Sequence, residues 1–153
     1  MKVLTQSLVF LTMWGCTMTN SDKSNPFFQE SDLYLNYPPF DEIKIEHYKP
    51  AFIKGMKDQK SEINKIAENI EPPTFENTIL AMEKSGAVLD RVATVFYALT
   101  SAHTNDDMEK IRADMAPKLS AHSDKILLNK SLFEKISNLY KGKNNLDIEP
   151  EGI

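Results

Sequence analysis

The chain has 153 residues, enough for one domain with a buried core but few for an enzyme with a deep cleft. Its 18 basic residues against 22 acidic ones give a net charge of −4, and the basic residues are scattered singly, so the sequence lacks the electrostatic footprint of a nucleic-acid-binding protein. The 5 glycines are too widely spaced for a phosphate-binding loop, which argues against nucleotide chemistry.

The chain begins like an exported protein. Lys2 precedes a mostly apolar stretch, Val3–Trp14, which is followed by Gly15 and Cys16. A stretch of about a dozen apolar residues is too short to span a bilayer comfortably and is typical of the core of a signal peptide. We therefore predict a signal peptide over residues 1–15 and a periplasmic or membrane-anchored bacterial protein.

The position of the lone cysteine suggests a lipid anchor. Cys16 directly follows the small residue Gly15 at the end of the apolar stretch, an arrangement similar to a bacterial lipobox, in which a peptidase cuts before the cysteine and the thiol carries lipid. Trp14 departs from the small residue that is usual at its position. Cys16 is thus a candidate lipidation site, and cleavage between Gly15 and Cys16 is the candidate processing step. Two other readings stay open, namely an ordinary cleaved signal and an uncleaved leader.

Two non-helical segments are expected before the first helix. Residues 16–24 are polar and predict a flexible tether. Residues 25–44 hold three prolines and several aromatic rings without helical period, which predicts an extended strap whose rings pack over the helices. A proline-rich ligand for a partner is the weaker reading, because no PxxP pattern repeats.

A long first helix is expected from about Ile45 to Asn69. Pro50 is expected in or near its first turn, where a missing backbone amide costs least. The apolar residues of this helix fall on a broadly helical stripe: Tyr48, Phe52, Met56, Ile63, Ile66 and Ile70.

A helical hairpin is expected next. Pro72 and Pro73 delay helix formation until Thr74, whose hydroxyl can cap the new helix, and Gly86 allows a left-handed residue at its end. A second helical period then runs to about His103, and the tight corner between the two segments predicts an antiparallel helical hairpin.

Two further helices complete the helical domain, which we place at residues 45–141, with an irregular tail over 142–153. Asn105 is the expected cap of a helix in which Pro117 predicts a kink or local unwinding. Ser131 or Asn129 caps a short last helix that Gly142 ends. No alternating strand pattern competes, so the predicted class is all-α, an antiparallel bundle of about four to five helices. The most regular apolar seam belongs to the fourth helix: Met108, Ile111, Met115, Leu119, His122 and Ile126.

Candidate chemistry is sparse. His47, His103 and His122 are far apart in sequence and none shares a helical turn with another, so they do not have the spacing of a zinc site. His103 is expected at the negative end of its helix and His122 as a partly buried packing residue. Glu42 and Glu46 are one turn apart, as in an acid and base pair, but a solvated helix end explains them better.

The other chemical signals have simpler explanations as well. Asp106 and Asp107 follow a cap and need no bound cation. The sequence contains no Gly-x-Ser-x-Gly elbow, and no cysteine follows Cys16. We therefore predict no catalytic and no metal-ligating residue in this chain.

Several segments together resemble a known family. They are NPFF at 25–28, PPFDEIKIEHYKPAF at 38–52, PPTFENTI at 72–79, EKSGAVLDRV at 83–92, ALTSAHTND at 98–106 and MAPKLSAHSDKILLN at 115–129. From roughly Asn25 to Glu151 the chain resembles the amino-terminal region of the M3 metallopeptidases, in particular the peptidyl-dipeptidase (dipeptidyl carboxypeptidase) and oligopeptidase A branch. The resemblance implies a zinc enzyme that removes carboxyl-terminal dipeptides from oligopeptides, with this region forming part of one wall of the substrate channel.

The same resemblance implies that the chemistry lies elsewhere. The zinc-binding His-Glu-x-x-His helix of the family lies far downstream in a much longer chain, and no segment here matches it. The first hypothesis is therefore an amino-terminal fragment of an exported M3-type peptidase, inactive alone, without a cofactor of its own, whose partners are oligopeptides and the remainder of the peptidase fold. The second is an independent small helical protein, secreted or lipid-anchored, that binds a partner.

Overall fold

A computed structural model describes residues 25–143, and within them the protein is all helical with no strand. The signal peptide, Cys16, the tether and most of the predicted tail lie outside the described residues. The elements are η2 (Pro26–Phe28), η3 (Tyr34–Asn36), α1 (Ile45–Glu68), η4 (Phe75–Leu80), α2 (Ala81–Glu83), α3 (Ala87–Ala102), α4 (Asp106–Leu127) and α5 (Lys130–Lys141). The predicted all-α class is confirmed. No helix in this part of the chain is both long and apolar enough to cross a membrane.

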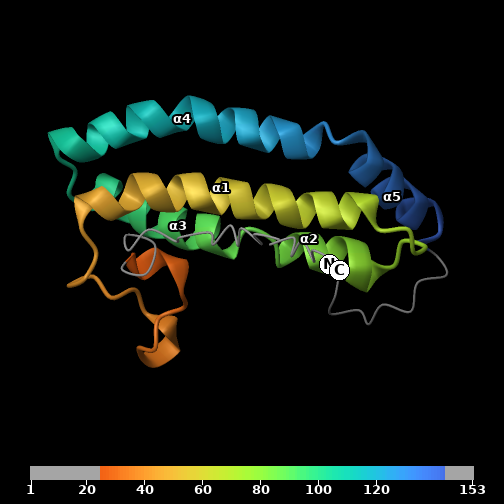
Figure 1. The fold of residues 1–153 in the computed structure, drawn as a ribbon, viewed down its shortest axis with the longest axis horizontal. Helices are drawn as coiled ribbons and strands as arrows, with labels where there is room; N and C mark the ends of the chain where they lie inside the picture. Colours follow the sequence, from red (N-terminus) through yellow and green to blue (C-terminus); the bar gives the residue numbers. More distant parts are fainter. Residues whose placement is uncertain (1–24, 144–153) are drawn as a thin grey trace, which may run out of the picture.

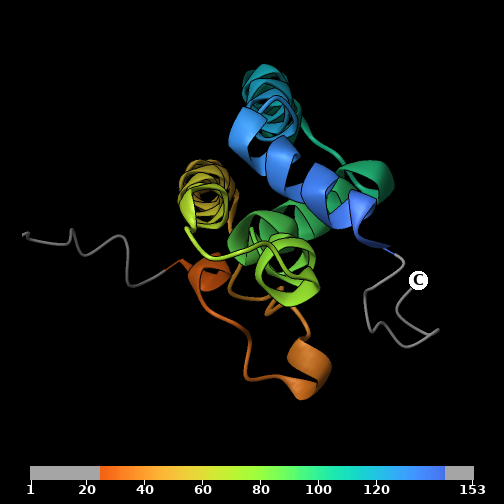
Figure 2. The ribbon, with the colours of Figure 1, turned by 90° about the vertical axis from the view of Figure 1, so that its right-hand side faces the viewer.

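Helix α1 is the centre of the arrangement, with α3 along one side and α4 along another (Figures 1 and 2). Helix α3 runs antiparallel to α1, whereas α4 runs parallel to it (Figure 1). Helix α5 lies at the end of α1 that is remote from Ile45. The main core joins α1, α3, α4 and the first residues of the described chain through Phe27, Tyr48, Ala51, Phe52, Val92, Val95, Phe96, Met108 and Met115. Two rings of this core pack edge to face against Phe96, whose centroid lies 5.1 Å from that of Tyr48 and 5.3 Å from that of Phe52.

The close approach of α1 and α3 depends on a glycine. A Cβ atom at Gly55 would lie 2.7 Å from both the backbone N and the Cα of Leu89. Only a residue without a side chain therefore allows the two helices to touch at this point.

The helix caps follow the sequence pattern. The side chain of Thr74 accepts a hydrogen bond from the Asn77 amide at 3.1 Å, which begins the helical turn at Phe75. Asn105 and Asn129 cap α4 and α5 in the same way. The predicted starts of these helices are confirmed, and the choice between Asn129 and Ser131 is settled in favour of Asn129.

The predicted hairpin between the helices on either side of Gly86 is wrong. Gly86 does adopt a left-handed conformation, with φ of 82°, and the helix does stop there. However, Ala81 and Met82 pack against the far half of α1, whereas Leu89 packs against its first half. The segment η4–α2–α3 therefore keeps one overall direction, antiparallel to α1, and Gly86 is a break within it rather than a reversal (Figure 1).

A second, smaller apolar cluster lies between the end of α1 that is remote from Ile45 and α5. Ile63 and Ile66 of α1 are buried there against Leu132 of α5. Ile70, which was expected on the same stripe, lies just after α1 and is 99% exposed. The apolar period of α1 therefore ends with the helix.

The two internal prolines leave their helices continuous. Pro50 is the sixth residue of α1, just beyond the first turn where it was expected, and Pro117 lies on an exposed position of α4. The predicted unwinding at Pro117 does not occur, since α4 is helical from Asp106 to Leu127. The helix instead curves gently along its length (Figure 1).

The segment 25–44 only partly follows the predicted strap. Phe27 is buried in the main core and Phe28 packs at its edge. Tyr34 and Tyr37, by contrast, are exposed on a loop that projects from the helical body (Figure 1). The expectation that all these rings lie over the helices is thus wrong for the middle of the segment.

Candidate functional site

The three histidines occupy three separate places. The Nδ1 atom of His47, at the start of α1, accepts a hydrogen bond from the Lys44 amide at 3.1 Å, and His103 ends α3 at an exposed position. His122 lies in the middle of the body on α4. Within residues 25–143 no three His, Cys, Asp or Glu side chains are grouped closely enough to hold a metal ion. The described residues therefore do not fit the zinc ion that the family resemblance implies.

His122 is a packing residue, as the sequence predicted. It is only 9% exposed, and its Nε2 atom lies 2.7 Å from Oε1 of Gln59 on α1. Because an amide oxygen only accepts, the imidazole donates in this hydrogen bond. Burial lowers the pKa of His122, and the nearby charges of Lys125 and Lys60 lower it further. A neutral, hydrogen-bonded imidazole between two helices has a structural role.

The two carboxylates that were considered as an acid and base pair face different spaces. Glu42 lines a cavity beneath the N-terminal segment, and Glu46 lines a groove on α1. Both are exposed. The solvated helix end that the sequence favoured is therefore the better description. Asp107 likewise serves its helix, since its amide binds the Asn105 cap and its carboxylate pairs with Lys110 at 2.9 Å.

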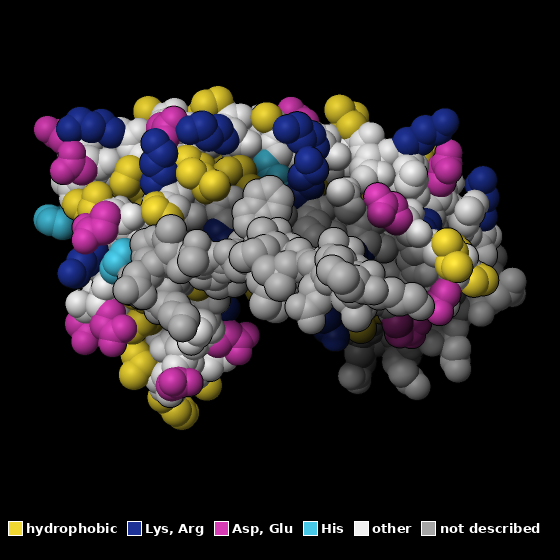
Figure 3. Space-filling model, viewed as in Figure 1, with side chains coloured by type: hydrophobic (Ala, Val, Ile, Leu, Met, Phe, Trp, Pro, Cys, Tyr) yellow, Lys and Arg dark blue, Asp and Glu magenta, His cyan; other side chains and the backbone are white. Residues whose placement is uncertain are grey.

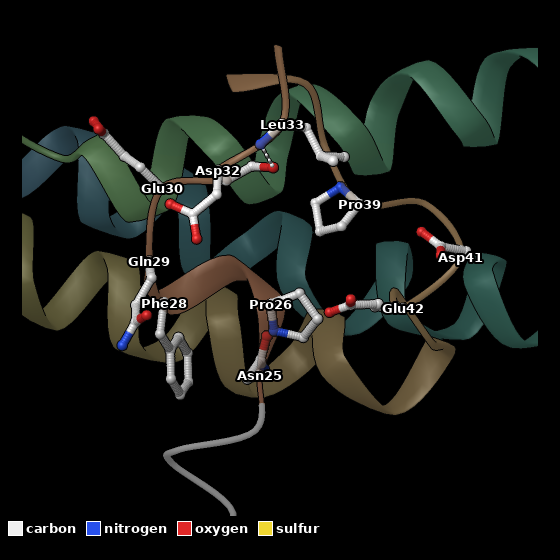
Figure 4. Close-up of a pocket in the computed structure, with 11 residues that line it drawn as sticks. Asn25, Pro26, Phe28, Gln29, Glu30, Asp32, Leu33, Pro39, Asp41 and Glu42 are labelled. Atoms are coloured by element: carbon white, nitrogen blue, oxygen red, sulfur yellow. Dashed lines mark hydrogen bonds between the residues drawn. The ribbon is translucent and has the colours of Figure 1, made fainter. Parts of the chain in front are cut away.

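The cavity beneath the N-terminal segment has a volume of about 490 Å³ and lies between η2 and the loop that follows it (Figure 4). Pro26 and Pro39 face each other across it, and the Glu42 carboxylate points toward Pro26. Four carboxylates line its walls: Glu30, Asp32, Asp41 and Glu42. None of the lining residues is a histidine, cysteine, lysine or arginine, so the cavity has no basic group that could bind an anion.

A larger groove of about 990 Å³ runs along the outer face of α1. Its apolar lining comes from Phe28, Ile45, Pro50, Ile53 and Ile111. Two of the lysines at its edge are paired, Lys49 with Asp114 at 2.8 Å and Lys54 with Asp58 at 2.7 Å. The groove is therefore an apolar surface with largely compensated charges, suited to contact rather than to catalysis.

Comparison with known proteins identifies relatives of this chain among peptidases. No family model matches the chain. It is 40% identical to a dipeptidyl carboxypeptidase of Escherichia coli (strain K12) over 129 residues, which are 84% of this chain and 19% of the relative. The chain is homologous to part of an M3-type peptidase. This M3-type segment is also similar to two further relatives. It is 38% identical to the dipeptidyl carboxypeptidase of Salmonella typhimurium over 85% of the present chain, and 24% identical to the oligopeptidase A of Escherichia coli over 78% of the present chain.

The M3-type segment spans about a fifth of the length of these relatives, 19% for both dipeptidyl carboxypeptidases and 17% for the oligopeptidase A. The matching part is the amino-terminal one. The resemblance that the sequence motifs indicated is therefore confirmed.

One surface of the M3-type segment was missed by the sequence reasoning. The rings of the loop after η2 were assigned to packing over the helices, yet three of them are exposed together with two leucines of the same loop: Leu33, Tyr34, Leu35, Tyr37 and Phe40. The available signal was the absence of a helical or strand period in this segment. Without such a period no regular element turns these apolar residues toward the core, so another surface must account for them.

Proposed function

We propose that this chain works as the amino-terminal helical part of an exported M3-type peptidyl-dipeptidase, an enzyme that removes dipeptides from the carboxyl ends of oligopeptides. The observation that carries the proposal is the 40% identity to a dipeptidyl carboxypeptidase over 84% of the chain. The helical fold without a grouped set of metal ligands in residues 25–143 is consistent with a supporting role.

In this proposal the chain supplies a wall of the substrate channel and no reacting group. Zinc, in the complete enzyme, would supply the chemistry of peptide hydrolysis from ligands outside this chain. The contribution of the described residues is a rigid frame, in which the core between α1, α3 and α4 fixes the relative positions of the helices. The expectation for the isolated 153-residue chain is that it does not hydrolyse peptides.

The direct test is an assay of the purified chain. We expect no turnover of a blocked tripeptide and no stoichiometric zinc by elemental analysis, with the dipeptidyl carboxypeptidase of Escherichia coli as the positive control. One zinc per chain together with peptide hydrolysis would overturn the assignment of the chemistry to residues outside this chain.

A chimera tests the positive side of the proposal. Residues 25–143 of this chain would replace the matching segment of the Escherichia coli relative, and hydrolysis of the same tripeptide would be measured. We expect the chimera to be active, because a homologous wall should support the same channel. An inactive chimera that is folded by circular dichroism would favour the alternative, an independent helical binding protein.

Export and lipid attachment are part of the proposal and rest on the leader sequence alone. Lys2 before the apolar stretch Val3–Trp14 supports export, and Gly15–Cys16 supports attachment of lipid to the Cys16 thiol. Labelling with radioactive palmitate in a bacterial host would show incorporation into the native chain and none into Cys16→Ser. Equal labelling of both chains would contradict lipidation at this cysteine.

A further inference from the structure

The loop between η2 and α1, residues 29–42, carries the densest group of exposed apolar side chains in the described part of the chain. Five large side chains within eight residues are solvent-accessible: Leu33 (51% exposed), Tyr34 (85%), Leu35 (80%), Tyr37 (62%) and Phe40 (44%). The loop projects away from the helices, and in the space-filling view its apolar and acidic side chains form the lower left extremity of the protein (Figures 1 and 3). We call these five residues the loop patch. A group of this kind on a small protein marks an interaction surface.

The base of the loop is held firmly to the helical body. Phe27 is buried, and its carbonyl oxygen accepts a hydrogen bond from Nη1 of Arg91 on α3 at 2.6 Å. The side-chain amide of Asn25 donates to the carbonyl of His47 on α1 at 2.9 Å. Ile43 packs against the main core at the other end of the loop. The loop patch is therefore presented from two fixed points, which lowers the entropy that a partner would have to remove.

The tip of the loop has a backbone conformation that its own residues do not favour. Leu35 and Asn36 both have positive φ, 55° and 53° respectively. The left-handed conformation is uncommon for a leucine, and such strain persists where surrounding contacts impose it. Within the described residues the Leu35 side chain is largely in solvent, so burial of this side chain does not impose the left-handed conformation. Tyr34 and Leu35, at this tip, are 85% and 80% exposed.

The charges around the loop patch are of one sign. Residues 29–42 include four carboxylates, Glu30, Asp32, Asp41 and Glu42, and no lysine or arginine. The surface that fits this loop is accordingly an apolar depression with basic groups at its edge.

We propose that the loop patch docks this segment onto the rest of an M3-type peptidase chain, in an apolar depression bordered by lysine or arginine. The inference rests on the proposed function and adds to it the surface that makes the contact. The relatives suggest the occupant, because the matching segment is 19% of the length of a dipeptidyl carboxypeptidase and four-fifths of such a chain lies outside it. A surface that is apolar, rigidly based and acidic at its border is suited to such a permanent contact.

The test uses the chimera with the Escherichia coli relative and the isolated 153-residue chain side by side. The loop variant is Tyr34→Ser, Leu35→Asn and Tyr37→Ser, in which asparagine keeps a residue that tolerates positive φ. The matched control is Ile70→Ser, Leu127→Ser and Leu128→Ser, three residues that are 99%, 73% and 82% exposed at the other end of α1. Melting temperature and hydroxyl-radical labelling of Tyr34 and Tyr37 are the readouts.

We expect the loop variant to lower the melting temperature of the chimera by at least about 2 °C and to leave that of the isolated chain unchanged, while the control changes neither. Tyr34 and Tyr37 should be labelled in the isolated chain and protected in the chimera. Equal labelling of the two tyrosines in the isolated chain and in the chimera would overturn the docking role, and so would an equal fall in melting temperature for the loop variant and the control. In either case an active chimera would still uphold the proposed function. An isolated chain that dimerises through the loop patch would overturn it too, because the occupant would then be a second copy.

Discussion

Gln59 on α1 accepts a hydrogen bond from His122 on α4, with 2.7 Å between Oε1 and Nε2. The same Gln59 side chain lies against Gly86, where an added Cβ would clash with its Nε2 atom. One glutamine thus touches α4 and the break before α3 at the same level of α1. This contact explains why a histidine occupies an otherwise apolar seam, and it links stability to pH and to the backbone at Gly86.

Acid should weaken the fold through His122. Its pKa is lowered in the folded state, chiefly by burial, so the unfolded chain takes up the proton more readily. The resulting stabilisation is fully present above the ordinary histidine pKa of about 6.5 and is lost as the pH falls through the lower pKa of the folded state. Urea unfolding between pH 7 and 5 should show this loss, and His122→Asn should reduce it. His103→Asn, at an exposed position, is the control; equal pH dependence in all three proteins would contradict the assignment.

Gly55→Ala should separate α1 from α3. The new Cβ would lie 2.7 Å from backbone atoms of Leu89, which can move only with the whole helix, so we expect a loss of about 1–3 kcal/mol in the free energy of unfolding. Gly142→Ala is the matched control, because its Cβ would meet nothing closer than 3.7 Å. Chemical denaturation of both variants measures the difference, and a Gly55→Ala protein as stable as Gly142→Ala would show that the helix contact is not tight.

Gly86→Ala should be unfavourable for a different reason. Its φ of 82° is left-handed, and a residue with a Cβ pays about 1–2 kcal/mol there. The Gln59 side chain is flexible and can move aside, so backbone strain should dominate. Gly86→Asn should therefore cost less than Gly86→Ala, since asparagine tolerates this conformation better. Thermal unfolding that ranks alanine above asparagine would contradict a backbone origin.

Phe96→Ala should be among the most destabilising substitutions in the chain. Phe96 is 1% exposed and contacts the rings of Tyr48 and Phe52, so its removal leaves a cavity in the main core and should cost about 3–5 kcal/mol. Phe133→Ala removes the same ring from a position on α5 that is 65% exposed, and there we expect a change within about 0.5 kcal/mol. If both substitutions lowered the urea midpoint by the same amount, burial of the ring would not determine the loss of stability.

Local patterns were enough to place the helices. The caps at Thr74 and Asn105 depend on residues within a few positions of each other, so they were correctly predicted, and Asn129 was one of two candidates for the last cap. The buried seam of α4 also followed from its period, down to the burial of His122. For the candidate site, sequence spacing placed His47, His103 and His122 on different elements, and the structure keeps them in separate places.

The failures concern the path of the chain between helices. A left-handed glycine permits a reversal but does not require one, so Gly86 alone could not distinguish a hairpin from a break. The direction was decided by partners that are distant in sequence. Gly55 leaves room for the backbone of Leu89, and the Glu62 carboxylate accepts a hydrogen bond from the Gly86 amide at 2.7 Å. The loop patch was misplaced for the same kind of reason, because hydrophobicity predicts that a side chain seeks cover without saying which surface covers it.

By itself the sequence determined the all-α class, the helix boundaries, the relation to the amino-terminal part of an M3-type peptidase and the separation of the histidines. These features depend on caps, periods and motifs that lie close together along the chain. Only the tertiary structure decided that α2 and α3 share one direction beside α1, that Glu42 and Glu46 face different spaces, and that the apolar residues of 29–42 point into solvent. Those outcomes depend on which distant surfaces meet, and contacts between residues remote in sequence fix that.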